Sequence, residues 1–146
     1  LRQSNIYGQY DKYDLKRSHV FGATITKVMN AKDSITVWGT GEEKRDLLHV
    51  SDLVSFVDAA ITRQEKEYAL YNVGVGSAVS IKELVNKIIE ISGREISIEH
   101  DLTKPTIKTN VFLDCQKAKN ELNWIPRVSL EDGILLTIEW YKENIL

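Results

Sequence analysis

Apolar positions recur along the chain at two spacings, and these spacings predict short strands and longer helices. Short apolar runs that end at glycine or polar turns predict strands at residues 1–6, 35–38, 45–50, 70–73, 96–99 and 111–113. Apolar residues three or four positions apart predict helices at residues 18–31, 51–61, 80–92, 114–122 and 129–144. The alternation lacks regular βαβ spacing, which favours a small α/β layer packed on something else over a complete doubly wound sheet.

Polar residues at the helix starts predict where the helices begin. Ser80 and Glu83 form a capping box, in which each side chain satisfies a backbone donor at the start of the helix. Ser18, Ser51 and Asp114 are the predicted caps of three other helices. The helix after Ser51 is expected to bury an apolar stripe made of Leu53, Val54, Val57 and Ala60.

Composition narrows the class of protein. Hydrophobic residues make up 42% and charged residues 27% of the 146 residues, which is ordinary for one globular domain. A formal net charge of -2 removes the electrostatic basis for nonspecific nucleic-acid binding. No apolar run approaches the roughly 20 residues of a membrane span. We therefore expect a soluble protein with no nucleic-acid and no membrane partner.

Cysteine and histidine are too few to predict a disulfide or a metal centre. The single Cys115 has no partner for an internal disulfide, and the N-terminus shows no secretion signal, which together predict the cytoplasm. The three histidines, His19, His49 and His100, lack the spacing of metal ligands. No metal site is predicted.

Two Gly-x-Gly segments are the candidates for a phosphate-binding loop. Gly39–Gly41 is followed by Glu42 and Glu43, whose carboxylates would repel a pyrophosphate, so a turn is the better interpretation. Gly74–Gly76 lacks a third glycine at the required offset. The residues alone therefore predict an α/β binding module with a polar loop at residues 9–17.

Several sequence blocks follow one another over nearly the whole chain. They are Arg2–Gly8, Asp11–Asp14, Ser18–Val20, Val37–Gly41, Arg45–Leu53, Tyr71–Gly74, Ser80–Leu84, Asp101–Pro105 and Leu113–Pro126. In this order they resemble the C-terminal half of extended short-chain dehydrogenases/reductases, and the GDP-L-fucose synthases most of all. The chain has Gln9 where that family usually has proline, and Thr106-Ile107 where it usually has Asp-Gly. The base and the sugar of the substrate therefore stay open.

The resemblance also implies how the chain is organised. Residues 1–8 would be the final strand of a Rossmann-type sheet and residues 9–146 a substrate-binding lobe, together one sugar-nucleotide-binding domain. The family's glycine-rich cofactor turn and Tyr-x-x-x-Lys motif do not occur in this sequence. We therefore expect part of a longer, homodimeric enzyme. Its N-terminal half would bind NADP(H) or NAD(H), and this chain alone would bind no cofactor and be inactive.

The resemblance assigns substrate-binding roles to six residues: Asn5, Val20, Lys27, Trp38, Arg45 and Lys104. Asn5 would bond to the sugar nucleotide from the end of a strand, while Val20, Lys27 and Trp38 would surround the nucleotide. Arg45 and Lys104 would meet the diphosphate, because a guanidinium fork binds phosphate oxygens in pairs and an ammonium adds a point charge. Without the resemblance, a turn-forming role explains Asn5 about equally well, and core packing explains Trp38 nearly as well. For lone basic residues such as Arg45 and Lys104, surface ion pairing is the usual role.

The family resemblance leads to one function and leaves two alternatives. It implies a nucleotide-diphosphate-sugar epimerase/reductase that epimerises a 4-keto sugar nucleotide and then reduces it with NADPH. His19 would be the acid/base group of the epimerisation, although its residue type alone predicts a solvent-exposed loop histidine. A UDP-sugar 4-epimerase or a sugar-nucleotide 4,6-dehydratase is the first alternative, in which His19 has no catalytic role. A noncatalytic sugar-nucleotide-binding module is the second.

Overall fold

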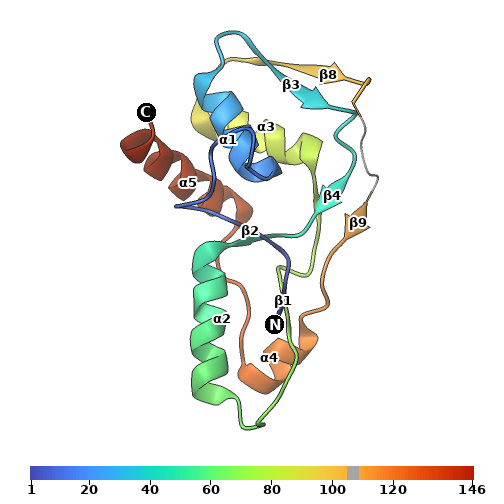
Figure 1. The fold of residues 1–146 in the computed structure, drawn as a ribbon, viewed down its shortest axis with the longest axis vertical. Helices are drawn as coiled ribbons and strands as arrows, with labels where there is room; N and C mark the ends of the chain where they lie inside the picture. Colours follow the sequence, from blue (N-terminus) through green and yellow to red (C-terminus); the bar gives the residue numbers. More distant parts are fainter. Residues whose placement is uncertain (105–108) are drawn as a thin grey trace.

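The computed structural model describes residues 1–104 and 109–146, and these form the predicted α/β architecture (Figure 1). The strands are β1 (Arg2–Gln3), β2 (Asn5–Tyr7), β3 (Ser34–Trp38), β4 (Lys44–Arg45), β5 (Leu47–His49), β6 (Asn72–Val73), β7 (Val79–Ser80), β8 (Ser97–Asp101) and β9 (Asn110–Val111). The helices are α1 (Val20–Asn30), α2 (Val50–Arg63), α3 (Ile81–Ser92), α4 (Gln116–Leu122) and α5 (Leu130–Asn144). In the described part of the chain, every helix is too short or too polar to cross a membrane.

Among the described residues, the strands form four small sheets instead of one continuous sheet. β1 pairs with β6, β2 with β5 and β3 with β8, and each of these pairs is parallel. β4 lies between antiparallel β7 and parallel β9. Parallel neighbours need long crossover connections, which is why helices separate the paired strands in the sequence. In the part of the chain that the structure describes, the strands do not make a complete dinucleotide-binding sheet, in agreement with the expected fold class.

Two hydrophobic clusters hold these elements together. In Figure 1, α1, α3 and α5 lie on one side of β2, and α2 and α4 lie on the other. The first cluster joins α1, α3, α5 and β3 through buried residues that include Ile25, Val28, Ile35, Leu84, Ile88 and Ile134. The second joins α2, α4, β5 and β6 through Leu48, Phe56, Tyr71, Val73, Leu122 and Trp124. β2 connects the clusters, because Tyr7 belongs to the first and Ile6 packs against the second.

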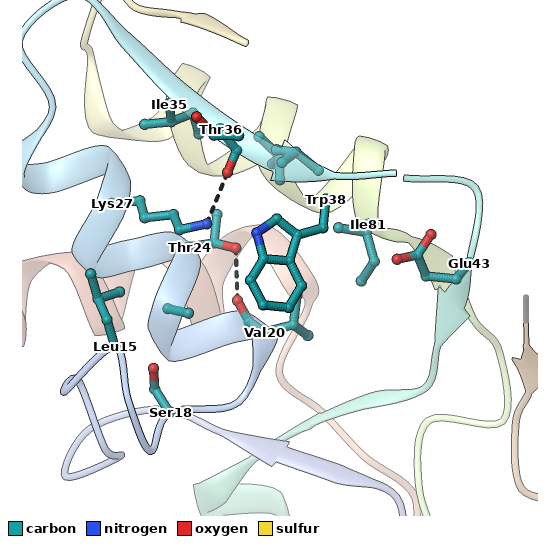
Figure 2. A pocket seen from close by; sticks show the side chains of 13 residues that line it. Leu15, Ser18, Val20, Thr24, Lys27, Ile35, Thr36, Trp38, Glu43 and Ile81 are labelled. Atoms are coloured by element: carbon teal, nitrogen blue, oxygen red, sulfur yellow. Dashed lines mark hydrogen bonds between the residues drawn. The ribbon is translucent and has the colours of Figure 1, made fainter. Parts of the chain in front are cut away.

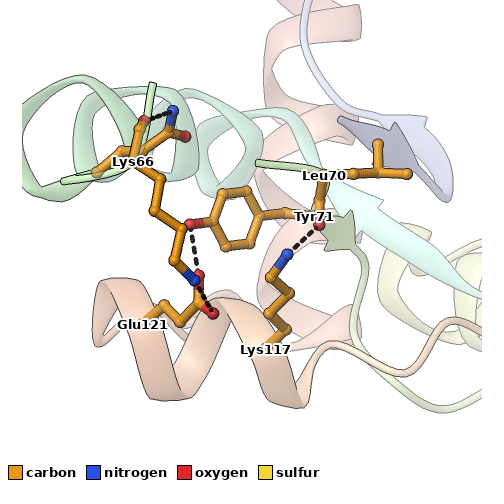
Figure 3. A network of polar contacts seen from close by, with 6 residues as sticks. Lys66, Leu70, Tyr71, Lys117 and Glu121 are labelled. Carbon is orange, nitrogen blue, oxygen red and sulfur yellow. Dashed lines mark hydrogen bonds and ion pairs between the residues drawn. The ribbon is translucent and has the colours of Figure 1, made fainter. Parts of the chain in front are cut away.

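A polar network fastens α4 to the segment before β6 (Figure 3). The Tyr71 hydroxyl donates to the Glu121 carboxylate at 2.9 Å, and the Lys66 ammonium lies 2.9 Å from the same carboxylate. Lys117 donates to the carbonyl oxygen of Leu70 at 3.0 Å, and its ammonium lies 4.9 Å from the centre of the Tyr71 ring. The pKa of Glu121 is lowered mainly by its hydrogen bond with Lys66. Exposed ion pairs contribute little free energy, so the network orients α4 more than it stabilises it.

The predicted capping residues act as expected at α3 and almost so at α4. The Ser80 hydroxyl accepts the backbone N–H of Glu83 at 3.1 Å, which confirms Ser80 as the cap of α3. At α4 the cap residue is Cys115, one position after the predicted Asp114. The Asp114 carboxylate nevertheless accepts the backbone N–H of Gln116 at 2.9 Å, so it satisfies a donor of the first turn.

The other two predicted caps are wrong. Ser18 belongs to the turn before α1, because its backbone N–H donates to Asp14 at 2.8 Å, and the helix therefore starts after His19. α2 starts after His49, not after Ser51. The His49 imidazole there accepts the backbone N–H of Ser51 at 3.3 Å, the role expected of a serine hydroxyl. The ring nitrogen of His49 thus caps α2 in place of the serine that residue preferences at helix starts predicted.

The buried face of α2 also differs from the predicted stripe. The residues that the helix buries are Asp52, Phe56 and Ala59. Of the predicted stripe, Val54 is 63% and Val57 is 40% exposed. The prediction counted only apolar residues, whereas the buried face begins with a carboxylate. The Asp52 carboxylate accepts hydrogen bonds from the backbone N–H groups of Arg127 and Val128, both at 3.0 Å. These bonds satisfy the buried charge and keep this face of α2 directed inward.

His49 is a buried titratable group at the junction of β5 and α2. Its side chain is almost completely buried, and its Nε2 atom has no hydrogen-bonding partner among the described residues. Burial lowers the pKa of His49 below its ordinary value of 6.5, and the charge of nearby Asp52 opposes this shift. The unfolded chain therefore takes up the proton at a higher pH than the folded chain does.

We expect the free energy of unfolding to fall as the pH drops below about 6.5, and part of this loss to come from His49. Urea denaturation at pH 7.5 and 5.5 measures the difference. His49→Asn keeps an acceptor at the cap but cannot titrate, so its stability should change less between the two pH values. An equal change in both proteins would assign the pH dependence to other groups.

Candidate functional site

A cavity of about 510 Å³ opens between α1, β3 and the first turn of α3 (Figure 2). Its lining comprises Leu15, Ser18, Val20, Ala23, Thr24, Lys27, Ile35, Thr36, Val37, Trp38, Glu43, Ile81 and Val85. Apolar side chains form most of the wall and a few polar groups are placed between them. This composition is typical of sites that bind small organic ligands.

The local structure explains why these side chains meet. On α1, Val20, Thr24 and Lys27 are four and three positions apart, so they lie on one face of the helix. On β3, Thr36 and Trp38 alternate with buried residues and lie on the exposed face of the strand. Figure 2 shows Lys27 reaching toward the backbone of Thr36 and the Trp38 ring beside Val20, so both elements contribute to the lining.

Trp38 and Lys27 supply the aromatic and cationic chemistry of the cavity lining, and Lys104 lies beside Trp38. The Lys27 ammonium donates to the carbonyl oxygen of Thr36 at 2.8 Å, and desolvation lowers the pKa of this lysine. The Trp38 side chain is 55% exposed, although tryptophan is usually well covered. The Lys104 ammonium lies 5.9 Å from the centre of the Trp38 ring. An exposed indole with cations beside it can stack a flat group and attract an anion.

Arg45 and Asn5 do not line this cavity. Arg45 lines a second cavity of about 260 Å³, and its guanidinium donates to the hydroxyl of Thr109. The Asn5 side chain donates to the backbone carbonyl of Asp46 at 3.1 Å, because β2 pairs with β5. Arg45 is two positions from Glu43, which lines the large cavity. Of the predicted contacts, Arg45 is thus on the segment that leads away from that cavity, whereas Asn5 is on β2.

His19 is exposed at the start of α1. Its neighbours Ser18 and Val20 both line the large cavity. The structure therefore brings Val20, Lys27 and Trp38 into the lining, and it leaves His19 beside the lining. The predicted differences from the family at Thr106-Ile107, and Pro105 before them, lie outside the described residues.

Sequence reasoning missed Glu43 as a member of the lining. Its position depends on the turn before it, where Gly39 and Gly41 have φ angles of +66° and +73°. Its backbone carbonyl accepts the N–H of Ile81 at 3.0 Å, which joins the start of α3 to the cavity. Thr24 was missed as well, but its spacing from Val20 and Lys27 was a usable signal. Glu43 had no comparable signal in the sequence.

The Gly74–Gly76 turn holds a carboxylate of the chain itself. Asp46 is almost fully buried and accepts the backbone N–H groups of Val75 at 2.9 Å, Gly76 at 3.3 Å and Leu113 at 3.1 Å. A Cβ atom on Gly74 would lie 2.6 Å from this carboxylate, so glycine is required there. The amides of the turn are already bonded to an anion and do not form a phosphate loop.

Comparisons with known proteins agree on one family. A family model described as the NAD dependent epimerase/dehydratase family matches residues 1–74. A putative GDP-L-fucose synthase 2 from Arabidopsis thaliana is 37% identical, and the match covers 98% of this chain and 44% of that protein. A UDP-glucose 4-epimerase from Thermotoga maritima, solved with UDP-glucose, has a TM-score of 0.82 at 28% identity, covering 99% of this chain and 46% of that one.

A second solved structure extends the comparison to another reaction. A dTDP-glucose 4,6-dehydratase from Bacillus anthracis, solved in complex with NAD, has a TM-score of 0.79 at 27% identity, covering 98% of this chain and 44% of that one. The chain thus spans less than half of the length of these relatives. The matched model covers just over half of the 146 residues, and the chain belongs to the NAD dependent epimerase/dehydratase family, the extended short-chain dehydrogenases/reductases.

Proposed function

We propose that this chain binds the nucleotide-diphosphate sugar of an epimerase/reductase similar to GDP-L-fucose synthase. The observation that carries the proposal is the cavity of about 510 Å³ with the exposed indole of Trp38 and the ammonium of Lys27 in its lining. A nucleobase presents a flat face that stacks on an indole, and its carbonyl oxygens accept from an ammonium. The putative GDP-L-fucose synthase 2 of Arabidopsis thaliana, 37% identical to this chain, supports the nucleotide-sugar class.

In this proposal the diphosphate extends from the cavity toward β4. Arg45 is the residue that binds it, because its planar fork offers paired donors to phosphate oxygens. Lys104, whose ammonium lies above Trp38, adds a point charge. Asn5 binds the sugar end of the ligand from β2, and Val20 packs against the nucleoside. Residues 1–8 would form the last strand of a Rossmann-type sheet, and residues 9–146 the substrate lobe.

The proposed chemistry of the chain itself is proton transfer by His19. A proton next to a ketone is acidic, so a base on one face of the sugar removes it and an acid on the other face returns it. Imidazole serves in either role near neutral pH. His19 is exposed between Ser18 and Val20, both of which line the cavity, so its side chain can reach a ligand that extends from it.

The described residues do not fit a dinucleotide cofactor. The carbonyl oxygen of Gly41 accepts the N–H of Lys82 at 2.9 Å, so this turn is closed against α3. The amides of the turn at residues 74–76 are bonded to Asp46. We propose that NADP(H) or NAD(H) is bound outside this chain in a homodimeric enzyme, and that the chain alone has no turnover.

Replacing Arg45 with alanine should weaken binding of GDP-L-fucose by roughly 10- to 150-fold, because one charged hydrogen bond contributes about 1.5–3 kcal/mol. Isothermal calorimetry with the protein measures this change directly. Arg45→Lys keeps the charge without the fork and should recover only part of the affinity. Lys44→Ala is the matched control, since it removes a neighbouring exposed cation from the same strand. Equal affinities of wild type and Arg45→Ala would refute the diphosphate role.

Two other functions have support of their own. A UDP-sugar 4-epimerase or a 4,6-dehydratase is favoured by the structural likeness to such enzymes, with TM-scores of 0.82 and 0.79. A noncatalytic sugar-nucleotide-binding module is favoured by the absence of the Tyr-x-x-x-Lys motif from this sequence. Incubation of the full-length enzyme with 4-keto and 4-hydroxy nucleotide sugars, followed by NMR of the products, separates the three, because each gives a different product or none.

A further inference from the structure

Glu43 is the only acidic side chain among the described residues that line the large cavity. Figure 2 shows it beside Ile81 at one end of the cavity, with Lys27 at the other end and the Trp38 indole between them. The side chain of Glu43 is half-buried. A half-buried carboxylate can accept hydrogen bonds from the donors of a ligand in this cavity.

The backbone on both sides keeps Glu43 in place. Before it, the turn at Gly39 and Gly41 fixes the direction of the chain through two positive φ angles. At Glu43 itself, the carbonyl oxygen accepts the N–H of Ile81 at 3.0 Å. After it, the N–H of Lys44 donates to the carbonyl of Thr109 at 2.8 Å. The carboxylate is therefore presented to the cavity by an ordered segment.

A carboxylate at the edge of a stacked base distinguishes the bases by their donors. Ionised Glu43 can only accept hydrogen bonds. Guanine presents two adjacent donors, N1–H and the N2 amino group, whereas uracil presents one N–H between two carbonyl oxygens that repel a carboxylate. Adenine and cytosine each place an acceptor beside their amino donor. Guanine is the base whose edge matches two carboxylate oxygens.

We infer that Glu43 is a specificity-determining residue that selects guanine as the base of the bound nucleotide. The inference rests on the proposed function, since it names the base that the same cavity takes. Trp38 does not discriminate, because every base has a face that stacks. Lys27 does not discriminate between guanine and uracil either, because both have a carbonyl oxygen that accepts from an ammonium. The choice between them falls to Glu43.

The test compares the binding of GDP, IDP and UDP to the protein by calorimetry and by quenching of tryptophan fluorescence. Wild type should prefer GDP to UDP by roughly 10- to 100-fold, which is the range for a charged hydrogen bond. IDP lacks the N2 amino group and should bind several-fold more weakly than GDP. Glu43→Gln should lower the affinity for GDP, raise that for UDP and bring IDP close to GDP. Glu42→Gln, at the exposed neighbouring position, should behave as wild type.

Two kinds of result overturn different statements. Equal affinities of wild type for GDP and UDP, or a Glu43→Gln variant with an unchanged preference, overturn the role of Glu43 and leave the proposed function intact. No binding of any of the three nucleotides or of GDP-L-fucose overturns the proposed function itself. Thermal melting followed by circular dichroism checks that Glu43→Gln folds. The comparison of IDP with GDP on wild type tests the inference even when that variant does not fold.

Discussion

Replacing Asp46 with alanine is expected to lower the free energy of unfolding by about 3–5 kcal/mol. The Asp46 carboxylate is 2% exposed and accepts three backbone N–H groups, from Val75, Gly76 and Leu113. Each buried donor that loses its acceptor costs about 1–3 kcal/mol, and water that enters recovers part of this. The donors come from the turn after β6 and the segment after β9, so one side chain holds together parts of the chain that are far apart in sequence.

Urea denaturation of wild type and Asp46→Ala measures this effect. Asp46→Asn should lose less of the free energy of unfolding, because the amide oxygen still accepts hydrogen bonds although the amide nitrogen cannot. This variant remains informative if the alanine variant does not fold. Asp58→Ala removes an exposed carboxylate from α2 and should change the free energy of unfolding by less than about 0.5 kcal/mol. Hydrogen exchange should accelerate at the amides of Val75, Gly76 and Leu113 in the Asp46 variants. Unchanged exchange rates at these three amides would show that the Asp46 carboxylate does not hold the two segments together.

Elements whose determinants are local in sequence were predictable. The start of α3 follows from Ser80 and Glu83, which lie within one turn of each other, and its end follows from Gly93 with φ of +69°. The strand β3 was predicted at residues 35–38 from an apolar run that ends at Gly39, and the structure places it at Ser34–Trp38. Both ends of α3 depend on neighbouring residues, so the sequence displays them directly, whereas the caps of α1 and α2 are not the serines that residue preference alone predicted.

Elements that depend on distant partners were not predictable in the same way. Asp52 helps to orient α2, because its carboxylate oxygens accept hydrogen bonds from the backbone N–H groups of residues 127 and 128, about 75 positions later in the chain. No local pattern shows that a carboxylate begins the buried face. The same reason explains why the two apolar residues Val54 and Val57 were assigned to the core although they are exposed.

The candidate site shows the same division. The family resemblance selected Val20, Lys27 and Trp38, and the structure brings all three to one cavity. Glu43 was not predicted as a lining residue, because the carboxylates after the turn were considered only for their repulsion of a pyrophosphate. Its place in the lining results from the contact of its backbone with Ile81, which is 38 positions away in the sequence. Binding roles for all of these residues stay predictions.

Replacing His19 with asparagine is expected to slow epimerisation by the full-length enzyme about 10²- to 10⁴-fold, the usual effect of losing an acid/base group. Asparagine retains a polar group of similar size but cannot exchange a proton near neutral pH. Reduction of a 4-keto sugar nucleotide that needs no epimerisation should persist, because it depends on groups that the substitution leaves intact. Lys16→Gln, at an exposed position of the same loop, is the control for a nonspecific change of the loop.

Solvent deuterium exchange at the carbons that flank the ketone measures the proton-transfer step by itself. In D₂O, wild type should incorporate deuterium at these carbons, as followed by NMR, and His19→Asn should do so far more slowly. Lys16→Gln should exchange at the wild-type rate. If His19→Asn exchanges as fast as wild type, His19 is not the acid/base group. The proposed reaction then gives way to a UDP-sugar 4-epimerase or a 4,6-dehydratase, in which this histidine takes no part.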